Sequence, residues 1–198
     1  MTFSFCTIAP FGGTMLETLV FSSGFVDEQL EDFIRPLDVR EVQRSHTSNL
    51  VLLPSELAWN NDYIFAVTKE RLFRLSEINM YLHQVNFQNV DIIRDNIVSS
   101  ISLMKTSPGV PVFCFYGNQL NSTVKRLKFR DHFLDQPFSL EYGPGDGTVN
   151  LESLNLCEMF TDSQTESVTV EELPGVGHLD ILGNRELFDA LGMLLNDG

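Results

Sequence analysis

Residues 143–150 read Gly-Pro-Gly-Asp-Gly-Thr-Val-Asn, which sets one carboxylate among three glycines and a proline. Because glycine and proline are unfavourable inside helices and strands, this stretch predicts a tight loop. Such a rigid loop fixes the direction of the one side chain that it carries, here that of Asp146. Further along the chain, His178 follows Gly175-Val-Gly177 in a second glycine-rich stretch. The sequence therefore predicts a chain organised around an Asp146/His178 pair.

The flanking sequence alternates between strand-like and helix-like runs. Residues 110–116 are β-branched and aromatic throughout, the pattern of a strand buried on both faces, and residues 2–9 predict a second interior strand. Further strands are expected at 138–142 and 166–173, and helices at 14–20, 76–85, 90–104, 151–160 and 184–196, the last burying Leu187, Leu191, Leu194 and Leu195. Residues 126–135 are charged and predicted to be exposed. Strands alternating with helices predict an α/β architecture with a parallel sheet, in one domain spanning 1–198.

Composition narrows the classes of function. The chain has 198 residues, 43% of them hydrophobic, which is enough for one domain with a core. A formal charge of −14 argues against nucleic acid as a partner. No apolar run reaches the roughly 18–20 residues of a membrane-spanning helix, and the first residues lack the basic region of a signal peptide. Three cysteines without metal-ligand spacing predict no metal site, and no cofactor is expected.

Two interpretations of the Asp146/His178 pair are open from the residues alone. A carboxylate after one strand and a histidine after the next is the layout in which Asp orients an imidazole that acts as a base. In α/β-hydrolases the chain order is Ser, Asp, His, and the last two members fit here. Alternatively, Asp146 caps the helix that follows and His178 is an ordinary turn residue.

A set of motifs, in order along nearly the whole chain, resembles the lecithin:cholesterol acyltransferase family, with the nearest likeness to its lysosomal phospholipase A2 (group XV) branch. The motifs are Ala9-Pro-Phe-Gly-Gly13, Arg40-Glu-Val-Gln-Arg-Ser45, Leu52-Leu-Pro54, Trp59, Val112-Phe-Cys-Phe-Tyr-Gly117, Gly145-Asp-Gly-Thr-Val-Asn150, Leu156-Cys157 and Leu173-Pro-Gly-x-x-His178-x-x-x-Leu182-x-Asn184. Departures are Phe11 in place of the usual Trp and Lys69-Glu70 where Thr-Pro is common.

The resemblance implies the C-terminal portion of an α/β-hydrolase fold, with an incomplete sheet, a lid-like segment at about 23–50 and a cap-like segment at about 50–109. It implies that Asp146 and His178 are the acid and base of a Ser-Asp-His triad that moves an acyl group from a glycerophospholipid to water or a lipid alcohol. It also implies that Cys114 and Cys157 form a disulfide, and that the protein is lysosomal or secreted.

The nucleophile of that triad is missing, because no Gly-x-Ser-x-Gly occurs in the sequence. The chain thus resembles the C-terminal half of such an enzyme. Three explanations are open: a truncated gene model or fragment, a shortened product with a binding or regulatory role, or a half that assembles with a missing N-terminal half. Whether the chain is an enzyme stays open with them, the alternative being a catalytically inactive module that binds lipid or a partner.

One further motif, Asn121-Ser-Thr123, is the only Asn-x-Ser/Thr acceptor pattern for N-glycosylation. It has meaning only if the chain enters the secretory route.

Overall fold

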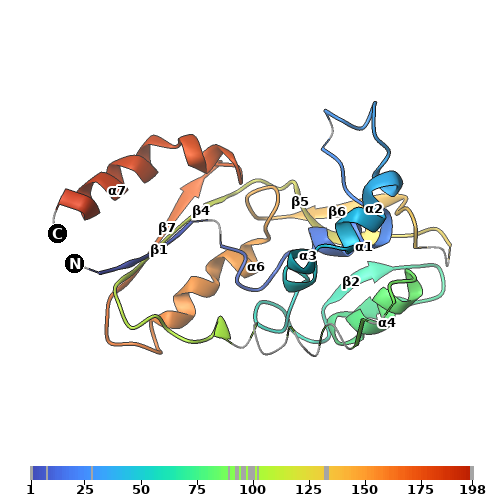
Figure 1. Cartoon of the computed structure of the whole chain (residues 1–198), viewed down its shortest axis with the longest axis horizontal. Helices are drawn as coiled ribbons and strands as arrows, with labels where there is room; N and C mark the ends of the chain where they lie inside the picture. Colours follow the sequence, from blue (N-terminus) through green and yellow to red (C-terminus); the bar gives the residue numbers. More distant parts are fainter. Residues whose placement is uncertain are drawn as a thin grey trace.

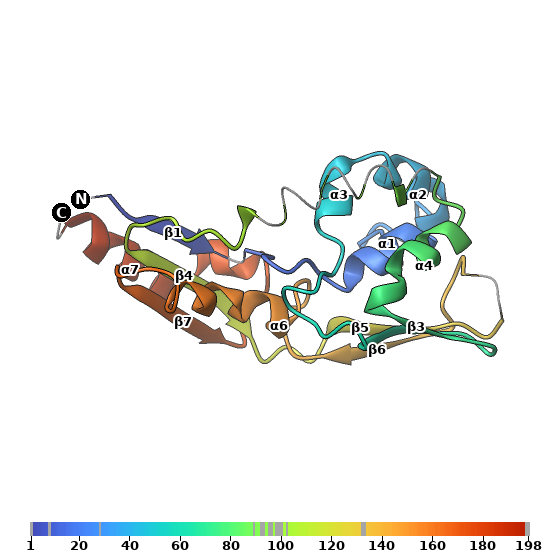
Figure 2. The ribbon, with the colours of Figure 1, turned by 90° about the horizontal axis from the view of Figure 1, so that it is seen from below.

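The computed structural model describes residues 2–7, 9–27, 29–88, 90–91, 94, 97, 101, 103–131 and 134–196. Two open sheets, one parallel and one mixed, carry helices on their faces (Figure 1). The sheets lie towards opposite ends of an elongated molecule (Figure 2). This arrangement confirms the predicted α/β class and is consistent with part of an α/β-hydrolase fold. Among the described residues, no helix combines the length and the apolar character needed to cross a membrane.

The first sheet has the strand order β1-β4-β7, all parallel. Its strands are β1 (Ser4–Thr7), β4 (Val112–Asn118) and β7 (Val168–Pro174). The central strand β4 is buried along almost its whole length, as its unbroken apolar run predicts. The strands predicted at 110–116 and 166–173 are confirmed.

The prediction that residues 2–9 form an interior strand is wrong for the described chain. β1 pairs only with β4, so it is the edge of the sheet, and all four of its residues are only partly buried. An apolar run indicates a strand with covered faces but says nothing about whether each edge has a partner.

Helical segments cover both faces of this sheet. On one face η3 (Asp180–Gly183) and α7 (Arg185–Asn196) pack Ile181 and Leu187 against Phe115 of β4. On the other face lie α6 (Leu151–Leu154) and η2 (Asn155–Phe160), whose Phe160 packs with Val112. The predicted C-terminal helix is confirmed, but Leu195 is 69% exposed and not buried as predicted, because it lies on the outer side of α7.

A disulfide joins Cys114 of β4 to Cys157 of η2, with their Cα atoms 6.5 Å apart. Both cysteines are buried in the small cluster with Val112 and Phe160, whereas Cys6 is free. The bond therefore holds η2 on the central strand, next to the loop that carries Asp146.

The second sheet has the order β3-β2-β5-β6. Its strands are β2 (Ile64–Val67), β3 (Leu72–Arg74), β5 (Thr123–Lys128) and β6 (Ser139–Gly143). The strand expected at 138–142 is confirmed. The prediction that 126–135 is exposed is wrong at its apolar positions, since Leu127 is fully buried and Phe129 and Leu134 are almost fully buried. A register shift between Val124 and Arg126 breaks the alternation of β5, so that Val124 and Leu127 both join the core.

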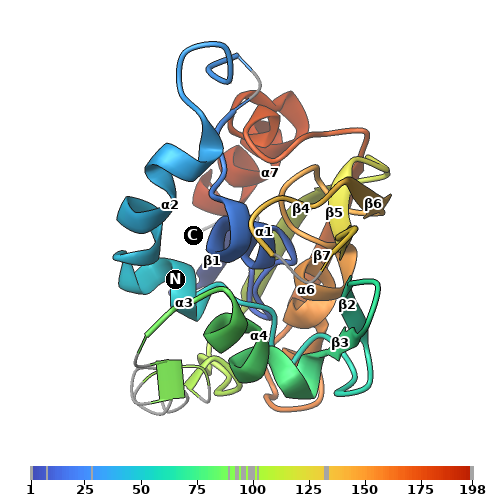
Figure 3. The same ribbon diagram turned by 90° about the vertical axis from the view of Figure 1, so that its right-hand side faces the viewer.

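Among the described residues, five short helical segments lie on the side of this second sheet that holds the larger core, some packed on its strands and others on one another. They are α1 (Leu16–Ser23), α2 (Pro36–Arg44), α3 (Thr47–Val51), η1 (Leu75–Glu77) and α4 (Ile78–Gln84). Tyr81 packs edge-on against Phe65 and Phe73, and all three are fully buried. Viewed along the long axis, α2 and α3 lie on the opposite side of α1 from β5 and β6 (Figure 3). The helix predicted at 76–85 is confirmed, whereas that at 90–104 lies largely outside the described residues.

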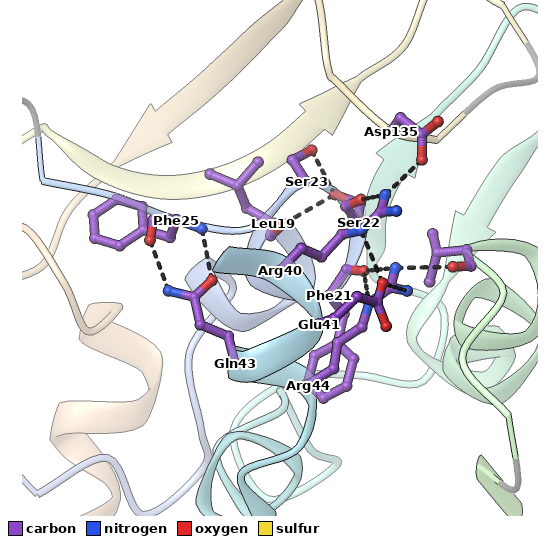
Figure 4. A network of polar contacts seen from close by, with 11 residues as sticks. Leu19, Phe21, Ser22, Ser23, Phe25, Arg40, Glu41, Gln43, Arg44 and Asp135 are labelled. Carbon is purple, nitrogen blue, oxygen red and sulfur yellow. Dashed lines mark hydrogen bonds and ion pairs between the residues drawn. The ribbon is translucent and has the colours of Figure 1, made fainter. Parts of the chain in front are cut away.

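Polar side chains of α2 hold the end of α1 and the segment after it (Figure 4). The Arg44 guanidinium, which is 5% exposed, donates to the carbonyl oxygens of Phe21 and Val85. Arg40 donates to the Ser22 carbonyl at 3.0 Å and to Asp135 Oδ1 at 2.6 Å. These contacts fix the stem from which residues 29–35 project as an exposed loop (Figure 1).

We expect the Cys114–Cys157 disulfide to stabilise the fold through its closed loop, which spans a sequence separation of 43 residues. The chain-entropy model gives about 4 kcal/mol for a loop of this length. Replacing both cysteines by alanine should lower the free energy of unfolding in urea by that order. Cys6→Ala is the control and should change it little; an equal loss in both variants would contradict the assignment.

The burial of Glu17 should make the free energy of unfolding depend on pH. This residue of α1 is 8% exposed, its Oε2 has no hydrogen-bond partner among the described residues, and burial raises its pKa from 4.5 to about 8. Between these pH values the unfolded chain ionises Glu17 while the native protein keeps it protonated. Its contribution to stability is therefore present below pH 4.5 and is lost as the pH rises to about 8.

The measurement compares urea unfolding of the wild type and Glu17→Gln at several pH values. Glutamine cannot ionise, so the variant should gain on the wild type by about 1 kcal/mol for each pH unit across this window. Taking the difference between the two proteins cancels the other carboxylates. Parallel stability curves would contradict the inferred burial of a neutral carboxyl group.

Candidate active site

The loop of residues 143–150 wraps its backbone around the Asp146 carboxylate. Oδ1 accepts hydrogen bonds from the backbone N–H of Thr148 at 3.0 Å and of Val149 at 2.7 Å. The residue is only 1% exposed. Asp146 does not cap α6, because both N–H groups precede that helix, whose N-cap is Asn150. The local sequence thus satisfies one carboxylate oxygen and leaves the other for a partner.

That partner is His178. Its Nδ1 lies 2.8 Å from Asp146 Oδ2, and its backbone N–H donates to the Asp146 carbonyl oxygen at 2.9 Å. The histidine follows β7 on a turn that Gly117 allows, since a Cβ at Gly117 would lie 1.9 Å from the Val176 carbonyl oxygen. The two sequence-predicted site residues are therefore brought together by both their side chains and their backbones.

Side chains from distant parts of the chain hold the Asp146 loop in place. Asn150 Oδ1 accepts from the backbone N–H of Met15 at 2.9 Å, and its Nδ2 donates to the Val124 carbonyl at 2.8 Å. Thr14 donates to the Thr148 carbonyl at 2.6 Å, and Thr123 Oγ1 accepts from the Gly147 N–H at 2.9 Å. Sequence reasoning assigned no anchoring role to Asn150 or Thr123. No local pattern carries one, because the partners are far apart in sequence.

The pair has the arrangement of a base and its orienting carboxylate. With Nδ1 directed at a buried carboxylate, the imidazole is held in the tautomer that carries its proton on Nδ1 and leaves Nε2 as the acceptor. The His178 side chain is 23% exposed, and no described residue is hydrogen bonded to Nε2. Nε2 is thus left able to accept a proton from a further group.

The described residues contain no group of three or more His, Cys, Asp or Glu side chains that could hold a metal ion. Two cavities of the described chain lie away from Asp146 and His178. One of about 360 Å³ lies beside α4 and includes Leu57, Ile78 and Arg94. The other, of about 320 Å³, lies between the stem of the projecting loop and β6, and is lined by Leu19, Phe25, Val26, Leu140 and Tyr142 among others.

Comparison with known proteins places this geometry in a family. The family model described as lecithin:cholesterol acyltransferase matches residues 92–185, which include both Asp146 and His178. A mouse protein named lysosomal phospholipase A and acyltransferase is 32% identical over 176 residues, which is 89% of this chain. The chain belongs to the lecithin:cholesterol acyltransferase family. The resemblance inferred from the motifs is confirmed.

Other family members give the same result over the same extent. A phosphatidylcholine-sterol acyltransferase of chicken is 30% identical over 88% of this chain, and a lecithin-cholesterol acyltransferase-like protein of Arabidopsis thaliana is 31% identical over 88%. The chain spans 42% of the mouse protein, 41% of the chicken protein and 38% of the plant protein. It therefore corresponds to about two fifths of the length of these acyltransferase-family relatives.

The close packing of the Asp146 loop predicts that Gly145 tolerates no side chain. A Cβ there would lie 2.3 Å from the Val149 carbonyl oxygen and 2.6 Å from Thr123 Oγ1. Gly145→Ala should therefore lower the free energy of unfolding by about 1–3 kcal/mol. The matched control is Gly183→Ala, where nothing lies within 4 Å of the new methyl group. Urea unfolding of both variants measures the difference; equal stability would show that the loop is looser than described.

Proposed function

We propose that Asp146 and His178 are the orienting acid and the general base of an active site that transfers an acyl group from a glycerophospholipid to water or to a lipid alcohol. The observation that carries this proposal is the 2.8 Å contact between a buried Asp146 and His178 Nδ1, which leaves Nε2 without a hydrogen bond among the described residues. The names of the mouse and chicken relatives, a phospholipase and acyltransferase and a phosphatidylcholine-sterol acyltransferase, support the class of reaction.

In this proposal the two nitrogens of the His178 imidazole have different roles: Nε2 transfers the proton and Nδ1 is held by Asp146. His178 Nε2 removes the proton of a serine hydroxyl as the oxygen attacks the ester carbonyl, and then returns it to the departing lysolipid oxygen. The resulting acyl-enzyme is cleaved by water or an alcohol activated in the same way. Asp146 holds the ring through Nδ1 and stabilises the imidazolium formed in each step. The proposed steps use only these side chains and a serine hydroxyl, without a metal or cofactor.

The serine is the component that this chain does not identify. The sequence lacks Gly-x-Ser-x-Gly, and no described hydroxyl is bonded to His178 Nε2. We therefore propose that the nucleophile comes from residues outside these 198. The same observation favours a second candidate function, a catalytically inactive module that binds lipid or a partner protein through the same surfaces.

Lipid binding is proposed for the segments at about 23–50 and 50–109, as lid and cap. In the first, Phe33 is 84% exposed and Leu30 is 50% exposed on the projecting loop, beside the cavity lined by Phe25 and Val26. Apolar side chains exposed together are typical of surfaces that meet a membrane or a lipid. The lysosomal name of the mouse relative supports a lysosomal or secreted localisation.

The roles of the pair are tested in the product of the full-length transcript. If that product contains a serine nucleophile, His178→Ala and Asp146→Asn should each reduce fatty-acid release from phospholipid vesicles by about 10⁴-fold. Asp189→Asn is the matched control, because Asp189 pairs with Arg185 on the exposed surface of α7, outside the lid and cap segments, and should leave the rate unchanged. Near-normal turnover of either pair variant would refute the proposed roles.

The 198-residue chain alone separates the two candidate functions. The proposed triad predicts no fatty-acid release from it, since the pair has no nucleophile, whereas His178-dependent release would place the nucleophile inside the chain. If the full-length transcript encodes only these residues, vesicle binding without release would favour the inactive module.

A further inference from the structure

The acceptor motif Asn121-Ser-Thr123 occupies the connection between β4 and β5. Asn121 and Ser122 are exposed on this turn, whereas Thr123, the first residue of β5, is fully buried. An exposed asparagine in a surface turn is the usual setting of an N-linked glycan. A buried third residue is unusual in such a motif, because the modifying enzyme must bind the hydroxyl group of that residue.

The hydroxyl of Thr123 is used by the folded protein. Its Oγ1 accepts the hydrogen bond of the Gly147 N–H at 2.9 Å. The same oxygen lies only 2.6 Å from the position that a Cβ at Gly145 would take. Thr123 is also paired in register with Gly143 of β6. Once β5 has joined the sheet, the acceptor motif can no longer be bound in an extended form with its hydroxyl free.

The same turn lies against both loops of the candidate active site. The Leu120 N–H donates to the Gly145 carbonyl oxygen at 3.2 Å. The Leu120 side chain lies 3.6 Å from the position of a Cβ at Gly177, next to His178. Leu120 therefore contacts the loops of both Asp146 and His178, and a group attached to Asn121 would be carried by the next residue of the chain.

We propose that Asn121 is N-glycosylated, that the glycan is added before β5 pairs with β6, and that it stands beside the Asp146–His178 pair in the folded protein. In this step the Asn121 amide nitrogen displaces a lipid diphosphate from C1 of a lipid-linked oligosaccharide. The carbon–oxygen bond to phosphate breaks, a carbon–nitrogen bond forms, and the amide loses one proton to a base of the transferase. No oxidation or reduction takes place.

The first experiment translates the chain behind a cleavable leader sequence in the presence of endoplasmic-reticulum microsomes. A single glycan should slow the chain on a gel, and peptide N-glycosidase should remove it. Asn121→Gln should abolish the shift, while Ser122→Ala and Thr123→Ser, which keep the acceptor pattern, should retain it. This readout does not require the chain to fold. An unshifted wild type, or a shift that survives in Asn121→Gln, would overturn the assignment.

The second experiment tests the order of events. The purified unglycosylated chain, with its Cys114–Cys157 disulfide formed, is incubated with microsomal transferase and lipid-linked oligosaccharide beside the same chain reduced and unfolded. The unfolded chain should be modified at least tenfold faster than the folded one. Equal rates would show that Thr123 is accessible in the native protein and would overturn the proposed order.

Discussion

The hydrogen bond between Asp146 and His178 depends on a carboxylate that has been removed from water. A buried charge is tolerated only when its oxygens are satisfied, and here two backbone N–H groups and one imidazole nitrogen do so. The backbone of residues 143–150 can turn this tightly only because Gly145 and Gly147 have no side chains. Asn150 then ties the loop to the residue before α1 and to β5 of the second sheet. The fold around the site is in this sense arranged to support one carboxylate.

Three carboxylates of this chain show how environment decides what such a group does. Asp91 Oδ2 lies 2.9 Å from His83 Nε2, but the Asp91 side chain is 61% exposed and the His83 side chain 50% exposed. Water therefore competes for their contact. Glu17 is buried without a partner for Oε2, and its pKa rises until the group is neutral at ordinary pH. Asp146 is buried with every contact supplied, which lets it remain a fixed acceptor. Of these, only the third combines burial and hydrogen bonds to both oxygens with a partner whose second nitrogen has no hydrogen bond among the described residues.

Much of this could be predicted from the sequence, and the failures have identifiable causes. The central strand, the C-terminal helix and the Asp146 loop were predicted because their composition leaves few alternatives. The exposed edge of β1 was not, because an apolar run carries no information about edge pairing. Nor was β5, where a bulge sets Val124 and Leu127 on the same core and hides the alternation. The anchoring roles of Asn150 and Thr123 depend on contacts with Met15 and Gly147, which no local pattern encodes.

The candidate pair is self-contained within this chain. The contacts that orient His178 come from Asp146, and those that fix Asp146 come from residues of the same loop, whose own anchors are Thr14, Met15, Thr123 and Val124. None of them requires a nucleophile to be present. The pair is therefore preorganised, and bringing in a serine hydroxyl would add one hydrogen bond at Nε2 without rearranging the loop. Because the base is fixed in advance, the group that reaches Nε2 determines the function, and the turn that carries Asn121 lies against the loops of Asp146 and His178.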